Sequence, residues 1–149
     1  LIVPIKIDIS TGDVITPREV RYDYPLLLED KSIQLWSYDL ETILAEKIQT
    51  ILSRGLLNTR MRDFYDVTTL FDRYNDSINY NDLSLAFDKT CRKRETLSVL
   101  EQYEEILCSI SEDSTLQNLW KNYCRKYRLL LFFAKIMKSF ESNQVFFLT

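Results

Sequence analysis

The spacing of apolar residues changes near Asp39, and this change constrains the fold more than any other feature of the sequence. Before it, apolar and polar residues alternate along Ile5–Ile9 and Ser32–Tyr38, which is typical of half-buried strands, and residues 14–24 are also predicted to be extended. After it, apolar residues recur every three or four positions, as they do in amphipathic helices. The sequence therefore predicts an α+β fold that is mostly α.

About five or six helices are expected after the strands. The first spans Leu40–Arg54, with Asp39 as its N-cap and Gly55 in the left-handed conformation just past its end. We expect a small sheet of about three strands in residues 1–38 and a helical bundle in residues 39–149. The later helices are expected to begin at Asn58 or Thr59, within Asn79–Asp82, at Thr96, at Ser114 or Thr115, and at Leu130.

Composition places the chain among globular proteins that have their own core. Its 149 residues suffice for one ordinary domain, and a hydrophobic content of 46% excludes a disordered chain. No apolar stretch approaches the length of a membrane span, so no membrane association is predicted, and the first residues do not resemble a secretory signal. Three cysteines that lie far apart, Cys91, Cys108 and Cys124, are typical of reduced thiols, so a cytoplasmic location is expected.

Missing residue types exclude several kinds of catalytic site. The chain has no histidine, which excludes Ser-His-Asp triads, Cys-His pairs and histidine-bound zinc. Its two glycines, Gly12 and Gly55, are too far apart for a Walker loop or a dinucleotide-binding fingerprint. The net charge of −3 gives no overall attraction to nucleic acid. Catalysis would therefore depend on carboxylates, lysine, arginine or a carboxylate-bound metal.

Lys47 lies where the first helix is expected to be apolar. On a helical wheel of about 100° per residue, it falls on the same face as Leu40, Leu44 and Ile51, near the middle of the apolar stripe. A buried ammonium group is costly unless a carboxylate or a phosphate meets it. Lysine can also bury its stem and extend its ammonium group to water, so a purely structural explanation stays open.

The Arg-Asp-Phe-Tyr-Asp stretch at 62–66 brings two carboxylates into the next helix. Asp63 lies about 100° from the centre of that helix's inner face, and Asp66 about 160°. Asp63 is therefore the preferred active-site residue, and Asp66, which is expected to point outward, is a secondary candidate. Arg62 is expected to point outward as well, but a guanidinium group beside a cleft commonly holds phosphate.

Asp8 lies between two isoleucines on the first predicted strand. It belongs either to a solvated strand face or to a site that presents a carboxylate to Mg²⁺, which prefers oxygen ligands.

Two basic runs lie in the later helices. The second run alternates cations with Tyr123 and Tyr127, a pattern that can hold an RNA backbone and stack a base. Solvated helix ends, where cations are favoured, are the simpler explanation of either run alone. The runs are Lys89, Arg92, Lys93 and Arg94, and Lys121, Arg125, Lys126 and Arg128.

Taken together, several segments resemble the AbiEii/AbiGii toxins, which are nucleotidyltransferases of the DNA polymerase β superfamily. The most specific are Tyr38–Lys47, which contains LETILAEK, and Thr59–Asp66, which contains RDFYD. Ile7–Pro17, the Arg54-Gly55 pair and Leu119–Tyr123 add to the resemblance, which covers residues 5–127.

The resemblance implies a mechanism and a set of site residues. Lys47 and Asp63 match the family's catalytic lysine and aspartate, Arg54 and Arg62 are the expected phosphate-binding residues, and Asp8 is the expected metal ligand. In the superfamily, Mg²⁺ orients a nucleoside triphosphate (NTP) for attack on its α-phosphate. Lys47 would offset the triphosphate charge, while Asp63 would orient Lys47 or act as a base. A separately encoded antitoxin is the expected partner, and tRNA or another RNA is an expected acceptor.

One departure from the family pattern concerns the main metal ligands. The family's glycine-serine motif and Asp-x-Asp pair should precede Asp8, and the chain has nothing there. We therefore expect a C-terminal piece of a longer toxin, with part of the nucleotidyltransferase sheet in residues 1–38, that does not transfer nucleotides on its own. The alternative is a non-catalytic helical module that binds protein or RNA. The sequence does not fix an oligomeric state.

Overall fold

The computed structural model of the protein describes residues 4, 6, 7, 9 and 11–127. Within these residues a two-stranded sheet precedes five α-helices, so the predicted α+β, mostly α, fold is confirmed. The 3₁₀ turns η1 (Gly55–Leu57) and η2 (Asn75–Ser77) follow the first two helices. The other elements are β1 (Val20–Pro25), β2 (Ser32–Ser37), α1 (Leu40–Arg54), α2 (Met61–Tyr74), α3 (Tyr80–Lys93), α4 (Ser98–Glu112) and α5 (Ser114–Tyr127).

Strands β1 and β2 form an antiparallel hairpin in which Tyr22 pairs with Leu35. A hydrogen bond of 2.9 Å from the Leu26 N–H group to the Lys31 carbonyl closes the connecting loop. The strand predicted at residues 5–9 falls partly outside the described residues, and its described members belong to no strand. The helix predicted from Leu130 also lies outside the described residues.

Local capping groups set the ends of the helices, as predicted for α1 and α3. The Asp39 side chain accepts a hydrogen bond of 2.9 Å from the Thr42 N–H group, and Asn79 caps α3 in the same way. Gly55 ends α1 with a φ of +49°, and its N–H group donates to the carbonyls of Ile51 and Leu52.

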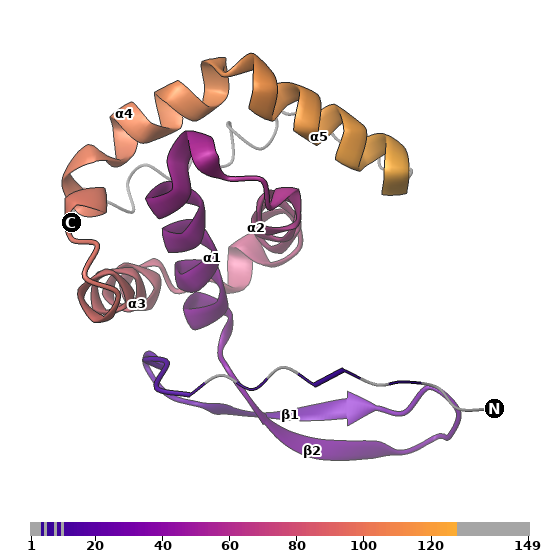
Figure 1. Ribbon diagram of the computed structural model, residues 1–149. Helices are drawn as coiled ribbons and strands as arrows, with labels where there is room; N and C mark the ends of the chain where they lie inside the picture. Colours follow the sequence, from indigo (N-terminus) through magenta and orange to yellow (C-terminus); the bar gives the residue numbers. More distant parts are fainter. Residues whose placement is uncertain (1–3, 5, 8, 10, 128–149) are drawn as a thin grey trace.

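Helix α1 is the centre of the helical part (Figure 1). It packs between α2 and α3, while α4 and α5 form an arc over its C-terminal end. The core therefore lies around the buried face of α1, where bulky side chains from four other helices meet it. The largest buried side chains include Leu44, Ile48, Ile51 and Leu52 of α1, Phe64 of α2, Leu83 and Phe87 of α3, Ile110 of α4, and Leu116 and Trp120 of α5.

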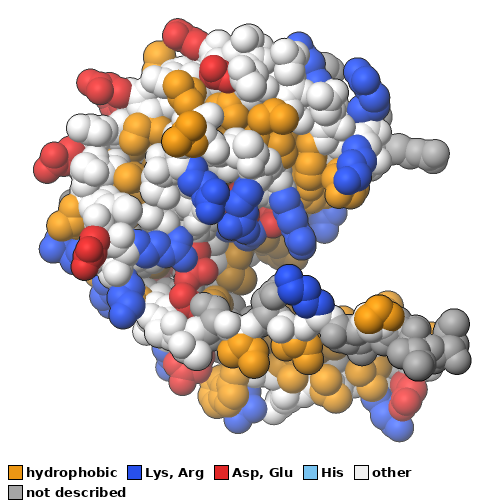
Figure 2. Space-filling view, viewed as in Figure 1, with side chains coloured by type: hydrophobic (Ala, Val, Ile, Leu, Met, Phe, Trp, Pro, Cys, Tyr) orange, Lys and Arg blue, Asp and Glu red, His pale blue; other side chains and the backbone are white. Residues whose placement is uncertain are grey.

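The hairpin extends beyond the N-terminal end of α1 (Figure 1). Thr16 holds the loop before β1 against α1, because its N–H and carbonyl groups both bond the Thr42 hydroxyl, at 2.9 and 3.0 Å. Figure 2 shows a hollow between the helical part and the hairpin, with Lys and Arg side chains gathered on its helical side. Among the described residues, no helix has both the length and the hydropathy that a membrane crossing requires.

Candidate functional site

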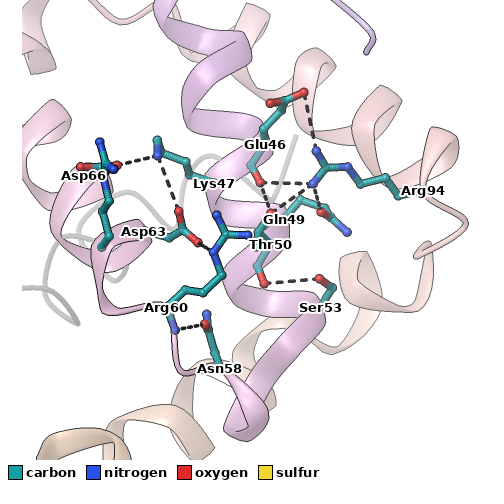
Figure 3. A network of polar contacts seen from close by, with 11 residues as sticks. Glu46, Lys47, Gln49, Thr50, Ser53, Asn58, Arg60, Asp63, Asp66 and Arg94 are labelled. Atoms are coloured by element: carbon teal, nitrogen blue, oxygen red, sulfur yellow. Dashed lines mark hydrogen bonds and ion pairs between the residues drawn. The ribbon is translucent and has the colours of Figure 1, made fainter. Parts of the chain in front are cut away.

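Helices α1 and α2 bring Lys47 together with two carboxylates (Figure 3). Lys47 Nζ donates a hydrogen bond of 2.6 Å to Asp66 Oδ2 and lies 3.6 Å from Asp63 Oδ1. The Lys47 side chain is 25% exposed, the Asp66 side chain 23% and the Asp63 side chain 7%. The ammonium group is therefore held in place by its partners but remains reachable from solvent.

Two arginines of α2 and its N-terminal end complete this charged cluster. Arg60 Nε lies 3.1 Å from Asp63 Oδ2, and Arg62 Nε lies 3.8 Å from Asp66 Oδ2. Three cations thus share two carboxylates, which leaves the cluster with one positive charge in excess. Because Arg62 is 81% exposed and Arg60 58% exposed, both guanidinium groups can turn toward an anion in solvent.

The position of Lys47 on α1 differs from the predicted one. Buried positions of the helix centre on Ile48, about 100° from Lys47 on the wheel, and both Leu40 and Ile43 are only half-buried. Lys47 therefore lies at the margin of the apolar stripe, not near its middle. Its long stem crosses this margin, so the ammonium group reaches α2 without being fully buried.

The outward orientation predicted for Asp66 is wrong. Asp66 makes the shorter of the two contacts with Lys47 and is only 23% exposed. The wheel describes α2 alone, whereas the partner side chain comes from α1, which crosses beside it. Arg62 does point outward, as predicted.

A second polar network surrounds the next turn of α1 (Figure 3). Arg94 donates hydrogen bonds to the Gln49 side chain and to Thr50 Oγ1, and its guanidinium group lies 3.6 Å from Glu46 Oε1. Gln49 is 2% exposed and also donates to Thr96 Oγ1 at 2.9 Å. This network fixes α1 against the connection between α3 and α4, and so fixes the helix that carries Lys47.

Acidic groups lie near the N-terminal half of α1. The Tyr38 hydroxyl donates a hydrogen bond of 2.9 Å to Asp13 Oδ2, and this bond raises the pKa of Tyr38. Burial raises the pKa of Glu46, and the negative charge of Asp13 raises it further, while Arg94 and Lys47 oppose the increase. The loop before β1 therefore places the Asp13 carboxylate close to the N-terminal half of α1.

Comparison with protein families identifies the family of the chain. A model described as "Nucleotidyl transferase AbiEii toxin, Type IV TA system" matches residues 2–134, which is most of the chain. The chain belongs to this family. No curated protein and no solved structure gives a significant match.

Membership of the AbiEii family connects the chain to nucleotidyl transferase toxins, whose systems pair a toxin with an antitoxin. Lys47 and Asp63, which the resemblance singled out from sequence, form one cluster in the structure with Asp66, the secondary candidate. Arg54 does not join it. This residue is exposed two turns further along α1 and, among the described residues, makes no hydrogen bond or ion pair with the cluster.

The magnesium site implied by the resemblance stays a prediction. The described residues contain no group of three or more His, Cys, Asp or Glu side chains that could hold a metal ion. Asp8, the predicted ligand, lies outside the described residues. The roles proposed for Lys47, Asp63 and Asp66 do not depend on a metal ion bound beside them.

Sequence reasoning missed Arg60, Glu46 and Arg94 as parts of the site. A local signal existed for Arg60, because it stands three residues before Asp63, at a spacing where side chains meet on a helix. Arg94 had no such signal, since it contacts Glu46 from 48 positions away in sequence.

Proposed function

We propose that Lys47 binds the triphosphate of an NTP in a nucleotidyltransferase toxin, which transfers the nucleotide to an acceptor such as tRNA. The acceptor's hydroxyl oxygen attacks the α-phosphate, the bond to the leaving pyrophosphate breaks, and the acceptor proton is lost to solvent or a base. This nucleotide transfer is expected to require Mg²⁺, and we expect the ligands of the metal outside the described residues.

The observation that carries this proposal is the geometry of Lys47 in an AbiEii chain. Its ammonium group is held by two aspartates at 2.6 and 3.6 Å, yet the surrounding cluster keeps a net positive charge and remains open to solvent. Charged groups that are already oriented stabilise developing negative charge without reorganising during the reaction. Asp63 and Asp66 are therefore proposed to orient Lys47, with Arg62 as an additional phosphate ligand.

Incorporation of labelled nucleotide by the whole protein tests the proposal. Lys47→Ala and Asp63→Ala are expected to lower incorporation by at least about 100-fold, the effect of losing one preorganised electrostatic group. Arg92→Ala is the matched control, because Arg92 pairs with Asp88 at 2.7 Å on the exposed surface of α3. Melting curves of each variant separate loss of folding from loss of chemistry. Wild-type incorporation in both active-site variants would refute the assigned roles.

A non-catalytic protein-binding module is the second candidate, and the hairpin favours it. One face of the hairpin carries exposed apolar side chains, including Tyr22, which is 52% exposed, and Leu35, which is 43% exposed. A face of this kind is typical of a surface that another protein covers. This candidate predicts that the purified protein incorporates no nucleotide and that Tyr22→Ser with Leu35→Ser abolishes toxicity in cells. Incorporation by the purified wild type would refute it.

A further inference from the structure

Four aromatic rings form a continuous row from α2 to the C-terminal end of α5. The Tyr123 ring stacks on Trp120 with centroids 5.6 Å apart and an angle of 20° between the planes. It also contacts Tyr127, at 4.7 Å, and Tyr65 of α2, at 6.3 Å. Trp120, packed against the middle ring of the row, is buried in the core at 1% exposed, and the row ends on the surface, where Tyr127 is 53% exposed.

The row starts beside the charged cluster. Tyr65 directly precedes Asp66 on α2, and its ring lies 6.3 Å from that of Tyr123. Burial raises the pKa of Tyr123, Asp66 raises it further and Arg62 opposes the increase. From there the rings continue along α5, with Tyr127 one helical turn beyond Tyr123. A ligand chain that reaches Lys47 at one end can therefore contact Tyr127 at the other.

Charge is segregated between helices α4 and α5. Helix α5 contains Lys121, Arg125 and Lys126 and no acidic residue, whereas α4 contains four glutamates and no cation. Lys126 Nζ lies 5.3 Å from the centre of the Tyr127 ring. In a chain of net charge −3, this is a local surface that suits a polyanion.

We infer that the α2–α5 aromatic row, formed by Tyr65, Tyr123 and Tyr127, binds the single-stranded end of an RNA acceptor. An unpaired base stacks on Tyr127, and the neighbouring phosphates contact Lys126 and Arg62. Exposed rings bordered by cations bind single strands because each base has a π-face and each linkage carries a charge. The base of the bound NTP is a poorer fit, because the row leads away from Lys47 for a further helical turn. The inference rests on the proposed function, since it locates the binding site for the acceptor of that reaction.

Fluorescence anisotropy of a labelled single-stranded 12-mer RNA of mixed sequence, titrated with the whole protein without NTP, tests this inference. Tyr127→Ala is expected to weaken binding by at least about fivefold, whereas Tyr127→Phe keeps the ring and the affinity. Tyr74→Ala is the matched control, because Tyr74 is 46% exposed and lies nine residues beyond Tyr65 on α2. Equal affinities of Tyr127→Ala and wild type, or a Phe variant as weak as the Ala variant, would overturn the inference.

Salt and competitors supply two further arms of the same experiment. Arg62→Gln and Lys126→Gln should each lower the slope of log affinity against log salt by about 0.7, the value for one lost phosphate contact with a single strand. Unlabelled duplex RNA should compete weakly, and equal competition by duplex would overturn the inference. Complete displacement by NTP would assign the rings to the nucleotide's own base and would overturn it too.

The two proposals fail in different ways. Lys47→Ala should abolish nucleotide incorporation and leave most of the RNA affinity, while Tyr127→Ala should lower RNA affinity and leave the affinity for NTP. Loss of RNA binding by Tyr127→Ala together with normal incorporation by Lys47→Ala would refute the triphosphate site alone. Normal RNA binding by Tyr127→Ala together with loss of incorporation by Lys47→Ala would refute the RNA site alone.

Discussion

Asp63 and Asp66 hold the same ammonium group from different environments. Asp63 is 7% exposed, lies in the first turn of α2 and contacts both Lys47 and Arg60. Negative charge is favoured in the first turn of a helix, so this carboxylate has three sources of stabilisation. Asp66 has the shorter contact with Lys47 but more solvent around it. Distance alone therefore does not rank the two carboxylates.

We predict that Asp63→Asn lowers the free energy of unfolding more than Asp66→Asn does. Removing the charge of Asp63 leaves a buried amide among cations and should cost about 1–3 kcal/mol. Asp66 is more solvated than Asp63, at 23% against 7% exposed, which limits its contribution to about 1 kcal/mol or less. Urea denaturation measures both values, with Asp88→Asn on the surface of α3 as the control. A larger loss in Asp66→Asn would contradict this ranking.

Glu46 gives a pH dependence whose sign follows from its raised pKa. Burial raises the pKa in the folded protein above the ordinary value of 4.5, so the protonated form is favoured by folding. The stability it contributes is present below about pH 4.5 and is lost as pH rises through the folded pKa. Glu46→Gln should therefore raise the melting temperature at pH 7 relative to wild type, and the difference should disappear below pH 4.5. A lower melting temperature at pH 7 would show that the ion pair with Arg94 outweighs the cost of burial.

At the scale of the element, helix ends were predictable where the capping group is local in sequence. Asp39, Gly55 and Asn79 each satisfy backbone groups within four residues, so the sequence near them contains the whole signal. The predicted start of α5 is confirmed as well, because the helix begins at Ser114 and Asp113 Oδ1, just before it, accepts from the Leu116 N–H group at 2.7 Å. The orientation of Asp66 was not predictable in this way, since it depends on how α1 and α2 cross.

Gly55 provides a testable prediction about the C-terminal end of α1. Its φ of +49° is unfavourable for a side chain, although an added Cβ would meet no atom closer than 3.9 Å. Gly55→Ala should therefore lower the free energy of unfolding by about 1–3 kcal/mol through backbone strain. Ser53→Ala, two residues earlier on the exposed side, removes only a 3.4 Å local hydrogen bond and should change it by less than about 0.5 kcal/mol. Equal unfolding curves for the two variants would mean that the end of α1 relaxes without strain.

At the scale of the whole molecule, α1 connects the core to the candidate site. Its buried face packs against α2, α3 and α4, while its margin carries Lys47. Amphipathic spacing predicted the helices because burial follows local periodicity, and Phe64 and Trp120 are both buried on their helices. The contacts of Arg94 with Glu46 and of Tyr65 with Tyr123 join distant segments, so only the packed structure reveals them.

The two tryptophans distinguish the core from the hairpin. Trp120 is 1% exposed, so Trp120→Ala should leave a cavity and cost about 3–5 kcal/mol in the free energy of unfolding. Trp36 is 61% exposed, with the Arg21 guanidinium 3.8 Å from its ring centre, and Trp36→Ala should cost about 1 kcal/mol or less. Thermal or urea unfolding followed by circular dichroism compares the variants. A similar loss for both would contradict the burial of Trp120 in the core.

The preference of the whole protein for a nucleoside triphosphate over the matching monophosphate tests the role of Lys47 most directly. Lys47→Met keeps most of the stem and removes the charge, and its folded fraction can be checked by its melting curve. The wild type should bind the triphosphate at least about tenfold more tightly, since one close charge contact is worth about 1.4 kcal/mol or more. In Lys47→Met this preference should fall by about tenfold, and Arg62 accounts for what remains. An unchanged preference in folded Lys47→Met would show that this ammonium group only joins α1 to α2.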